Sequence, residues 1–253
     1  MDRFLLTPFV IDQASPGHLR LRTPGAWVNQ PTFFDAGKVG RLQAVHASLA
    51  QAVHNSMTAG HRPVSVAGDC CAVLPVIAGL QRAGVAPRLL WLDAHGDFNT
   101  PETSPSGFIG GMPLAMLVGR GDQWLMDHLR MAPFPERDVV LFNARDLDPL
   151  EQDALAASEV KYLKTLEALA SEPLGDRPLH IHLDADVINP LDCPAVHYPA
   201  RGGPRLAELE AAMRRVVSAA RPVSFSMTTW IVDQDTDGRS QLAAMSILDA
   251  IRS

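Results

Sequence analysis

The chain has 253 residues, of which 47% are hydrophobic, and its formal net charge at pH 7 is −6. This length and apolar content suffice for one large core, and we expect a single domain over residues 1–253. A net negative charge without any run of basic residues argues against a nucleic-acid partner or an anionic membrane surface.

Short β-type runs alternate with amphipathic helical runs along the chain. Strands are expected at residues 62–68, 88–94, 138–144, 160–163, 179–187 and 222–227. Helices are expected at residues 37–60, 71–84, 112–118, 122–131, 148–157, 204–219 and 238–252. Because the strands are rich in Val, Leu and Ile, this alternation predicts an α/β fold with a parallel sheet that helices cover on both faces.

Three of the predicted strands end in residues that can bind metal ions. These strand ends are GDCC (68–71), DAHGD (93–97) and DADVINP (184–190). In open parallel sheets, sites form beyond the carboxyl ends of the strands. Alternate residues of an extended chain point to the same side, so two acidic or imidazole ligands can be presented together. The candidate metal ligands are Cys70, Asp93, His95, Asp97, Asp184 and Asp186.

Four carboxylates at one sheet edge predict a pair of divalent cations. Without cations, converging carboxylates repel, and some of them must take up protons. Bridging carboxylates hold two cations close together, and oxygen ligands with one imidazole suit Mn(II) better than Zn(II). Two such ions acidify water, which indicates hydrolytic chemistry. Each Asp taken alone could be a helix cap or a turn residue, but the shared feature of three strand ends favours the metal site.

The same segments resemble the metal-binding signatures of the arginase/agmatinase (ureohydrolase) family. The signatures are "AGDCC", "DAHGDFNTPETSPSG" and "HLDADVINP", in matching order and spacing. The similarity runs from about residue 62 to 252 and includes "ARDLDPLE", "PAVHYPARGG" and "DGRSQLAA". The resemblance implies a three-layer α/β/α sandwich around a mainly parallel eight-stranded sheet. It also implies a binuclear manganese site that cleaves guanidino or amidino C–N bonds, usually releasing urea.

The resemblance implies a role for each matched residue. Asp93 and Asp184 look like the bridging carboxylates, and both Asp97 and Asp184 are expected to act in catalysis. Asp97 and Cys70 would belong to the first metal site, and His95 and Asp186 to the second. The residues that match the binding site for an amino-acid head group are Asn99, Ser104, Ser106 and Asp148. For these four, ordinary loop polarity is the alternative, since Ser and Asn are common in exposed loops.

Three positions depart from the family pattern. Cys70 replaces the His that is the family's first metal ligand, and a thiolate shifts the preference away from Mn(II). A buried, inert cysteine beside an empty first site is the alternative. Gly110 replaces the His that arginases use as a proton shuttle, a role worth about 10²–10⁴-fold in rate.

The third departure is at about Thr229, which aligns with the Glu that binds the guanidinium group. Without that carboxylate, a cationic guanidinium loses its best partner. Three residues in neighbouring motifs could compensate for the missing carboxylate: Glu102, His197 and Tyr198. The alternative is that each of them has a structural role.

We therefore expect a metal-dependent hydrolase that acts on a guanidino, hydroxyguanidino or related amidine compound with an amino-acid head group. The Cys in place of His is similar to a branch that hydrolyses N-hydroxyarginine, although that branch keeps the Glu. One alternative is a catalytically impaired arginase-like protein that binds metal or ligand. Another is an amidase-type hydrolase that uses the same site.

The remaining expectations concern partners and location. We expect a small-molecule substrate, two Mn(II) ions per chain and a homo-oligomer, since trimers and hexamers are common in the family. Residues 1–13 lack a basic segment followed by a sustained apolar run, so no signal peptide is expected. No apolar run approaches the roughly 20 residues of a membrane-spanning helix. Three cysteines do not make a disulfide framework, which favours the cytoplasm.

Overall fold

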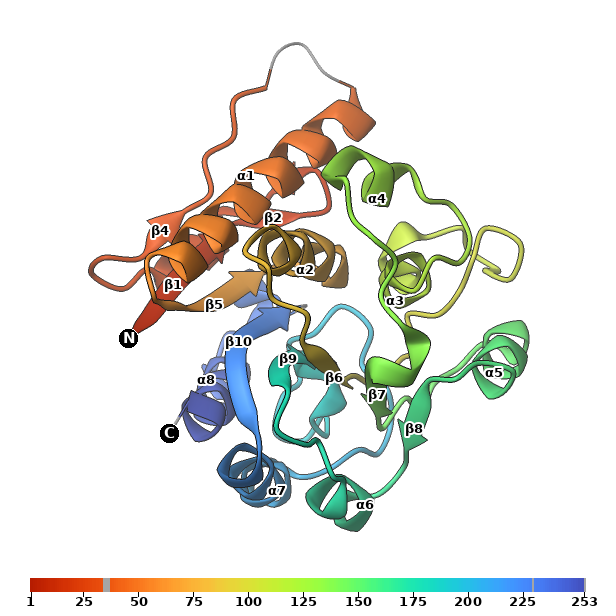
Figure 1. Cartoon of the computed structure of the whole chain (residues 1–253). Helices are drawn as coiled ribbons and strands as arrows, with labels where there is room; N and C mark the ends of the chain where they lie inside the picture. The colour runs from red at the N-terminus through yellow and green to blue at the C-terminus, as the bar shows by residue number, and fades with distance from the viewer. Residues whose placement is uncertain (34–36, 229, 253) are drawn as a thin grey trace.

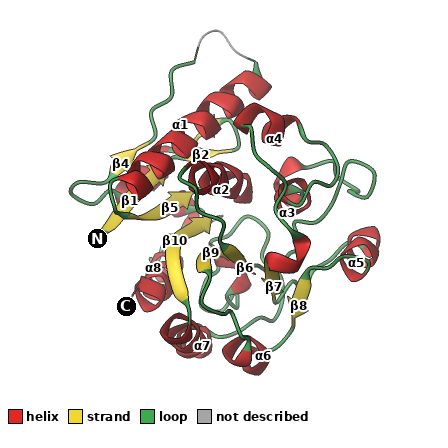
Figure 2. Cartoon of the chain, in the orientation of Figure 1, coloured by secondary structure: helices red, strands yellow, loops and turns green. Residues whose placement is uncertain are grey.

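The computed structural model describes residues 1–33, 37–228 and 230–252. An eight-stranded sheet with the strand order β4-β1-β5-β10-β9-β6-β7-β8 forms its centre, and every neighbouring pair is parallel. Helices cover both faces of this sheet (Figures 1 and 2). The predicted three-layer α/β/α fold is therefore confirmed.

The strands of the sheet are mostly short. In spatial order they are β4 (Trp27–Val28), β1 (Asp2–Thr7), β5 (Arg62–Ala67), β10 (Arg221–Thr228), β9 (Pro178–Asp184), β6 (Arg88–Leu92), β7 (Val139–Phe142) and β8 (Lys161–Leu163). A separate antiparallel pair consists of β2 (Phe9–Val10) and β3 (Gln13–Ala14).

The helices form two layers, one on each side of the sheet (Figure 1). One layer contains α1 (Lys38–Thr58), α2 (Val73–Arg82), α3 (Pro113–Leu117) and α4 (Trp124–Leu129). The other contains α6 (Leu166–Ser171), α7 (Leu206–Ala219) and α8 (Arg239–Arg252), while α5 (Pro149–Ala156) lies at the β8 edge. Short 3₁₀ turns are η1 (Pro16–Leu21), η2 (Cys70–Ala72), η3 (Ile109–Gly111), η4 (Glu136–Asp138), η5 (Ala185–Val187) and η6 (Val232–Gln234). Within the described ranges, no helix combines the length and the apolarity needed to cross a membrane.

Two apolar cores, one under each helical layer, hold the sandwich together. Alternate residues of β6 contribute to opposite cores: Leu89 and Trp91 pack in one, and Leu90 and Leu92 pack in the other. This follows from the two-residue period of a strand, and it explains why β6 carries apolar residues on both of its faces.

The structure differs from the sequence predictions at several elements. The strands β1 and β4 and the helix α6 were not predicted. The strand predicted at 179–187 ends at Asp184, where the Asp184 carboxylate accepts a hydrogen bond from the Asp186 backbone N–H at 2.9 Å. That local bond turns the chain into η5, so the predicted extension over 185–187 is wrong.

The strand order brings the three predicted metal-binding segments to one edge of the sheet. Strands β5, β10, β9 and β6 are consecutive neighbours and all run in the same direction. The segments that begin at Gly68, Asp93 and Ala185 therefore leave the sheet side by side.

A buried histidine outside this edge gives a prediction about stability. His46 lies on α1 with 2% of its surface exposed, and its Nδ1 has no hydrogen-bond partner among the described residues. Burial, with a smaller contribution from the charge of His128, lowers the pKa of His46 to about 3. Between about pH 6.5 and pH 3 the unfolded chain therefore binds a proton that the folded chain does not. The free energy of unfolding should consequently fall as the pH drops through this window.

Replacing His46 by Leu should make that fall shallower, by at most about 1.4 kcal/mol per pH unit. Urea unfolding of both proteins between pH 4 and pH 8 checks this. Above pH 7, His46 is neutral in both the folded and the unfolded chain. The difference in free energy of unfolding between the wild type and the His46→Leu variant should therefore be constant there. Parallel curves over the whole range would contradict the assignment.

Candidate active site

The six predicted metal ligands lie together at the carboxyl edge of the sheet. The Cys70 Sγ lies 2.8 Å from Asp184 Oδ2 and 3.9 Å from Asp93 Oδ2. On the other side of Asp93, the His95 Nδ1 lies 3.0 Å from Asp186 Oδ2 and 3.5 Å from Asp93 Oδ1. Asp93 thus contacts both halves of the cluster.

Neighbouring backbone and indole groups fix the orientation of these carboxylates. Asp93 accepts hydrogen bonds from the Trp91 indole N–H at 2.9 Å and from the His95 backbone N–H at 2.8 Å. Asp186 accepts one from the Ala94 backbone N–H at 3.1 Å. Arg145 supports the same turn, since its guanidinium donates to the backbone oxygen of Asp186 at 2.9 Å. The carboxylates of these candidate ligands are therefore held in fixed orientations.

Asp97 lines the same cavity as Cys70, His95 and Asp184, and one of its oxygens has no partner among the described residues. Its backbone has a φ of 49°, in the left-handed region, and it is 5% exposed. Its Oδ2 is buried and has no hydrogen-bond partner among the described residues. Burial raises the pKa of Asp97 well above its usual range, and the charges of Asp93 and Asp184 raise it further. An unpartnered carboxylate crowded by two others is what a cation would neutralise.

His95 currently supplies part of the positive charge that these carboxylates require. Burial alone would lower the pKa of His95, but its hydrogen bonds to Asp186 and Asp93 raise it to about 12. The ring is therefore protonated when no cation is bound, and it must lose a proton to act as a metal ligand. The donor set and the unpartnered Asp97 oxygen fit a pair of divalent cations.

A cavity of about 540 Å³ opens over the cluster. It is lined by ligand candidates and by all four residues predicted to bind a head group, namely Asn99, Ser104, Ser106 and Asp148. Asn99 Nδ2 donates to Asp148 Oδ2 at 2.9 Å, and the Ser104 and Ser106 hydroxyls are 3.5 Å apart. These polar groups therefore line the same cavity as the candidate metal ligands.

Glu151 is a cavity residue that the sequence analysis did not single out. Its carboxylate accepts from the Phe98 backbone N–H at 2.8 Å and from the Asp148 backbone N–H at 3.2 Å. It thereby ties the start of α5 to the loop that follows Asp97. Burial raises the pKa of Glu151 to about 7. The only signal for it in the sequence was its position three residues after Asp148, which is the capping-box spacing.

Comparison with known proteins identifies the family. The sequence profile of the arginase family matches residues 11–252. This chain belongs to the arginase family. Arginase from Neurospora crassa is 28% identical over 82% of this chain and 59% of its own length. Arginase from Bacillus subtilis is 32% identical over 70% of this chain and 64% of its own length. The chain therefore matches less than two thirds of the length of these curated arginases.

Solved structures show the same fold. The crystal structure of arginase from Bacillus subtilis superposes with a TM-score of 0.84 at 26% identity, covering 99% of this chain and 97% of that one. Proclavaminate amidino hydrolase from Streptomyces clavuligerus has a TM-score of 0.74 at 17% identity, covering 99% and 90% of the two chains. The second likeness shows the fold alone.

Two of the departures from the arginase pattern can be located. A Cβ added to Gly110 would lie 2.3 Å from a ring carbon of Phe108, so the Phe108 ring fills the space that a side chain at 110 needs. Cys70 points into the cluster, as its contacts with Asp184 and Asp93 show. Thr229, the third departure, lies outside the described residues.

The proposed compensating residues lie in different places. His197 and Tyr198 line the cavity, and the Tyr198 ring stands 6.3 Å from that of His95, edge to face. Glu102 is not among the described residues that line the cavity, and its carboxylate accepts instead from the Thr100 hydroxyl at 2.7 Å. Glu102 is therefore not placed to bind a ligand there.

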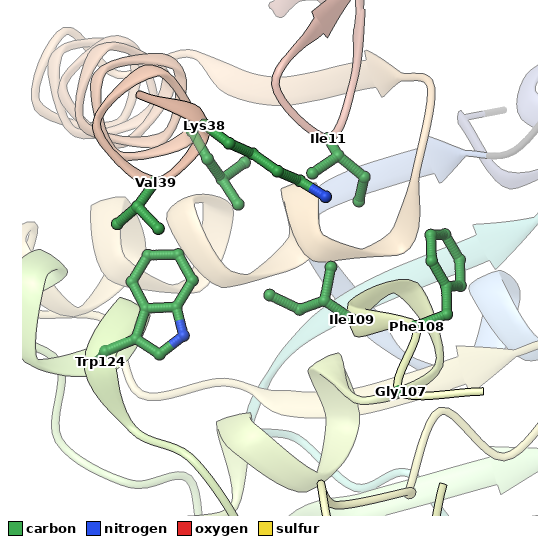
Figure 3. A pocket seen from close by; sticks show the side chains of 8 residues that line it. Ile11, Lys38, Val39, Gly107, Phe108, Ile109 and Trp124 are labelled. Carbon is green, nitrogen blue, oxygen red and sulfur yellow. The ribbon is translucent and has the colours of Figure 1, made fainter. Parts of the chain in front are cut away.

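The loop that carries Phe108 rests on apolar side chains. Figure 3 shows Phe108 and Ile109 facing Ile11 across a small pocket, with Val39 of α1 and Trp124 of α4 on its other side. The pocket measures about 170 Å³. Phe108 lines both this pocket and the large cavity, so the ring that occupies the space beside Gly110 stands between the two.

Proposed function

We propose that this protein is a metal-dependent hydrolase of the ureohydrolase type, which cleaves a C–N bond in a guanidino, hydroxyguanidino or related amidine compound. The observation that carries the proposal is the convergence of four carboxylates, one imidazole and one thiol under a single cavity, with a buried Asp97 oxygen left unpartnered. Membership of the arginase family supports the same reaction class.

The contacts support a division of the ligands between two Mn(II) ions. Asp93 and Asp184 would help to hold both ions, as the resemblance to the family implies, and Asp93 contacts both Cys70 and His95. Cys70 and Asp97 would complete the first position, and His95 and Asp186 the second. A pair of divalent cations bound there supplies Lewis-acid activation of water.

The residues of the chain would supply the proton transfer. Asp97 Oδ2 has no hydrogen-bond partner among the described residues, so with the other carboxylate oxygen as the ligand this one can take a proton from the attacking water. It can then return the proton to the leaving nitrogen. With glycine at 110, no imidazole is available from that position to share the task.

The polar loop would bind an amino-acid head group. The hydroxyls of Ser104 and Ser106 can donate to an α-carboxylate, and the Asp148 carboxylate can accept from an α-amino group. Asn99 orients Asp148 by donating to it. We also expect a homo-oligomer, which light scattering on the purified protein measures.

The reacting end of the substrate should be weakly basic. The sequence has Thr229 where arginases have the Glu that pairs with the guanidinium, and a cation without a counter-charge in a desolvated pocket is costly. The protein should therefore prefer an N-hydroxyguanidino amino acid to arginine, by about 10²-fold or more in kcat/KM.

Steady-state assays with Mn(II), which detect hydroxyurea and urea, test this preference. Arginine, its N-hydroxy derivative and agmatine should be compared at the same enzyme concentration. Arginine turnover in the ordinary range of about 1–10³ per second would contradict it. Turnover of neutral amides alone would favour an amidase, and no turnover with metal bound would favour a catalytically impaired arginase-like protein.

A further inference from the structure

A buried histidine beside the cluster is not among the predicted ligands. His182 lies on β9, two residues before Asp184 and therefore on the same face of the strand. Its side chain is fully buried, and its ring packs against that of Trp91 at 4.3 Å, centroid to centroid, with the two planes tilted by 60°. Its Nδ1 contacts the Ser226 hydroxyl at 3.0 Å, while its Nε2 has no hydrogen-bond partner among the described residues.

The unpartnered nitrogen matters because of what surrounds it. A ring nitrogen of His182, the Cys70 Sγ and an Asp93 carboxylate oxygen all lie within 4.8 Å of one another. Zn–S and Zn–N bonds are about 2.0–2.3 Å long, so one ion can reach donor atoms at this spacing. The Nε2 atom is the one that is free to take part, since Nδ1 is engaged with Ser226.

A hydrogen-bonded chain behind His182 supports this orientation. His180, on the same face of β9, contacts the Ser226 hydroxyl through Nε2 at 2.9 Å and the Ser224 hydroxyl through Nδ1 at 2.8 Å. If His182 Nδ1 donates to Ser226, then Ser226 donates to His180 and His180 donates to Ser224. That arrangement satisfies each member and leaves the lone pair of His182 Nε2 directed at the cluster. Metal-binding histidines are usually held in this way by a partner on their second nitrogen.

The two histidines of β9 differ in their hydrogen bonds. Both are fully buried, yet His180 has partners on both nitrogens and His182 has a partner on one. His46 also has an unpartnered nitrogen, so it is the position of His182 beside Cys70 and Asp93 that indicates a ligand.

We propose that His182 is a ligand of the first metal position, where it completes a sulfur, nitrogen and oxygen donor set with Cys70 and Asp93. This inference rests on the metal site of the proposed function. A set with one thiolate and one imidazole suits Zn(II) better than Mn(II), so the first position should select zinc. On binding, the ion replaces the thiol proton of Cys70, and that proton is released to solvent.

Zinc binding by the purified, metal-depleted protein tests the proposal, with the His182→Leu variant compared with His46→Leu. His46 provides the matched control, since it is also buried and also has an unpartnered nitrogen, but it lies on α1 away from the cluster. Competition with a chromophoric chelator should show Zn(II) affinity reduced at least about 100-fold by His182→Leu and unchanged by His46→Leu.

A second measurement covers the case in which His182→Leu does not fold. The wild-type protein is labelled with ¹⁵N at histidine, and its ring-nitrogen NMR signals are recorded. Adding Zn(II) should shift the signal of one ring nitrogen that belongs to neither His46 nor His95. The signals of these two residues are assigned from variants in which His46 or His95 is replaced by Leu or Gln. Zinc bound with equal affinity by both Leu variants, or bound without that shift, would overturn the role of His182 and leave the proposed function standing. A wild-type protein that binds neither Zn(II) nor Mn(II) would overturn both.

Discussion

Replacing Asp97 by Asn should lower kcat/KM for the preferred substrate by about 10³-fold, which corresponds to about 4 kcal/mol of transition-state stabilisation. The variant removes one negative charge from the first metal position and the oxygen that would carry the proton. Asn tolerates the left-handed backbone that Asp97 adopts, so the local conformation should survive the change.

Although Asp97→Asn should reduce activity, it should not reduce the stability of the metal-free protein. Without metal, the Asp97 carboxyl is buried close to the charges of Asp93 and Asp184, and removing it relieves that repulsion. The melting temperature of the metal-free protein should therefore stay constant or rise, while the increase on adding Mn(II) should be lost.

Glu102→Gln is the matched control for Asp97→Asn. It removes a carboxylate from the same loop, but from an exposed residue outside the cavity lining. Its kinetics and its metal-dependent stabilisation should equal those of the wild type. Equal losses in both variants would show that the loop, rather than the Asp97 carboxylate, is responsible.

Replacing Asp148 by Asn should lower kcat/KM for an amino-acid substrate by about 10²-fold, because an α-amino group would lose its counter-charge at a cost of about 3 kcal/mol. Asp148 precedes α5 as its N-cap, and Asn is equally favoured there, so the helix should keep its stability. The same substitution should leave kcat/KM unchanged for an analogue that lacks the α-amino group.

Asp146→Asn gives the control for the loss of one charge from the cavity. Asp146 also lines it, but the sequence resemblance gives it no contact with the head group. The value of kcat/KM should be measured in both variants, for the amino-acid substrate and for the analogue that lacks the α-amino group. If Asp148→Asn slows the two substrates equally, Asp148 does not bind the α-amino group.

Strands near the sheet's centre could be predicted from sequence because they are rich in Val and Leu. β5 (RPVSVA) and β6 (RLLWL) have this character, and the polar residues that follow them mark the carboxyl edge. β1 and β4 could not be predicted in the same way. β1 opens with Asp2 and Arg3, and β4 has two residues, too few for a period to show.

The convergence of the candidate ligands could be predicted, but several features of their environment depend on the fold. His182 shares its strand face with Asp184, and alternation along β9 could have indicated it. That its Nε2 is unpartnered beside Cys70 follows only from the packing of β9 against β6 and β10. The blocked space at Gly110 likewise depends on where the Phe108 ring packs.

The most direct test of the central claim is the number of divalent cations that the wild-type protein binds. After metal depletion and equilibration with excess Mn(II), elemental analysis of the dialysed protein should give two ions per chain, with the Asp97→Asn variant retaining fewer. Equilibration with Mn(II) and Zn(II) together should still give two ions in total. A protein that retains no divalent cation under either condition, while remaining folded, would contradict the assignment of this edge of the sheet as a metal centre.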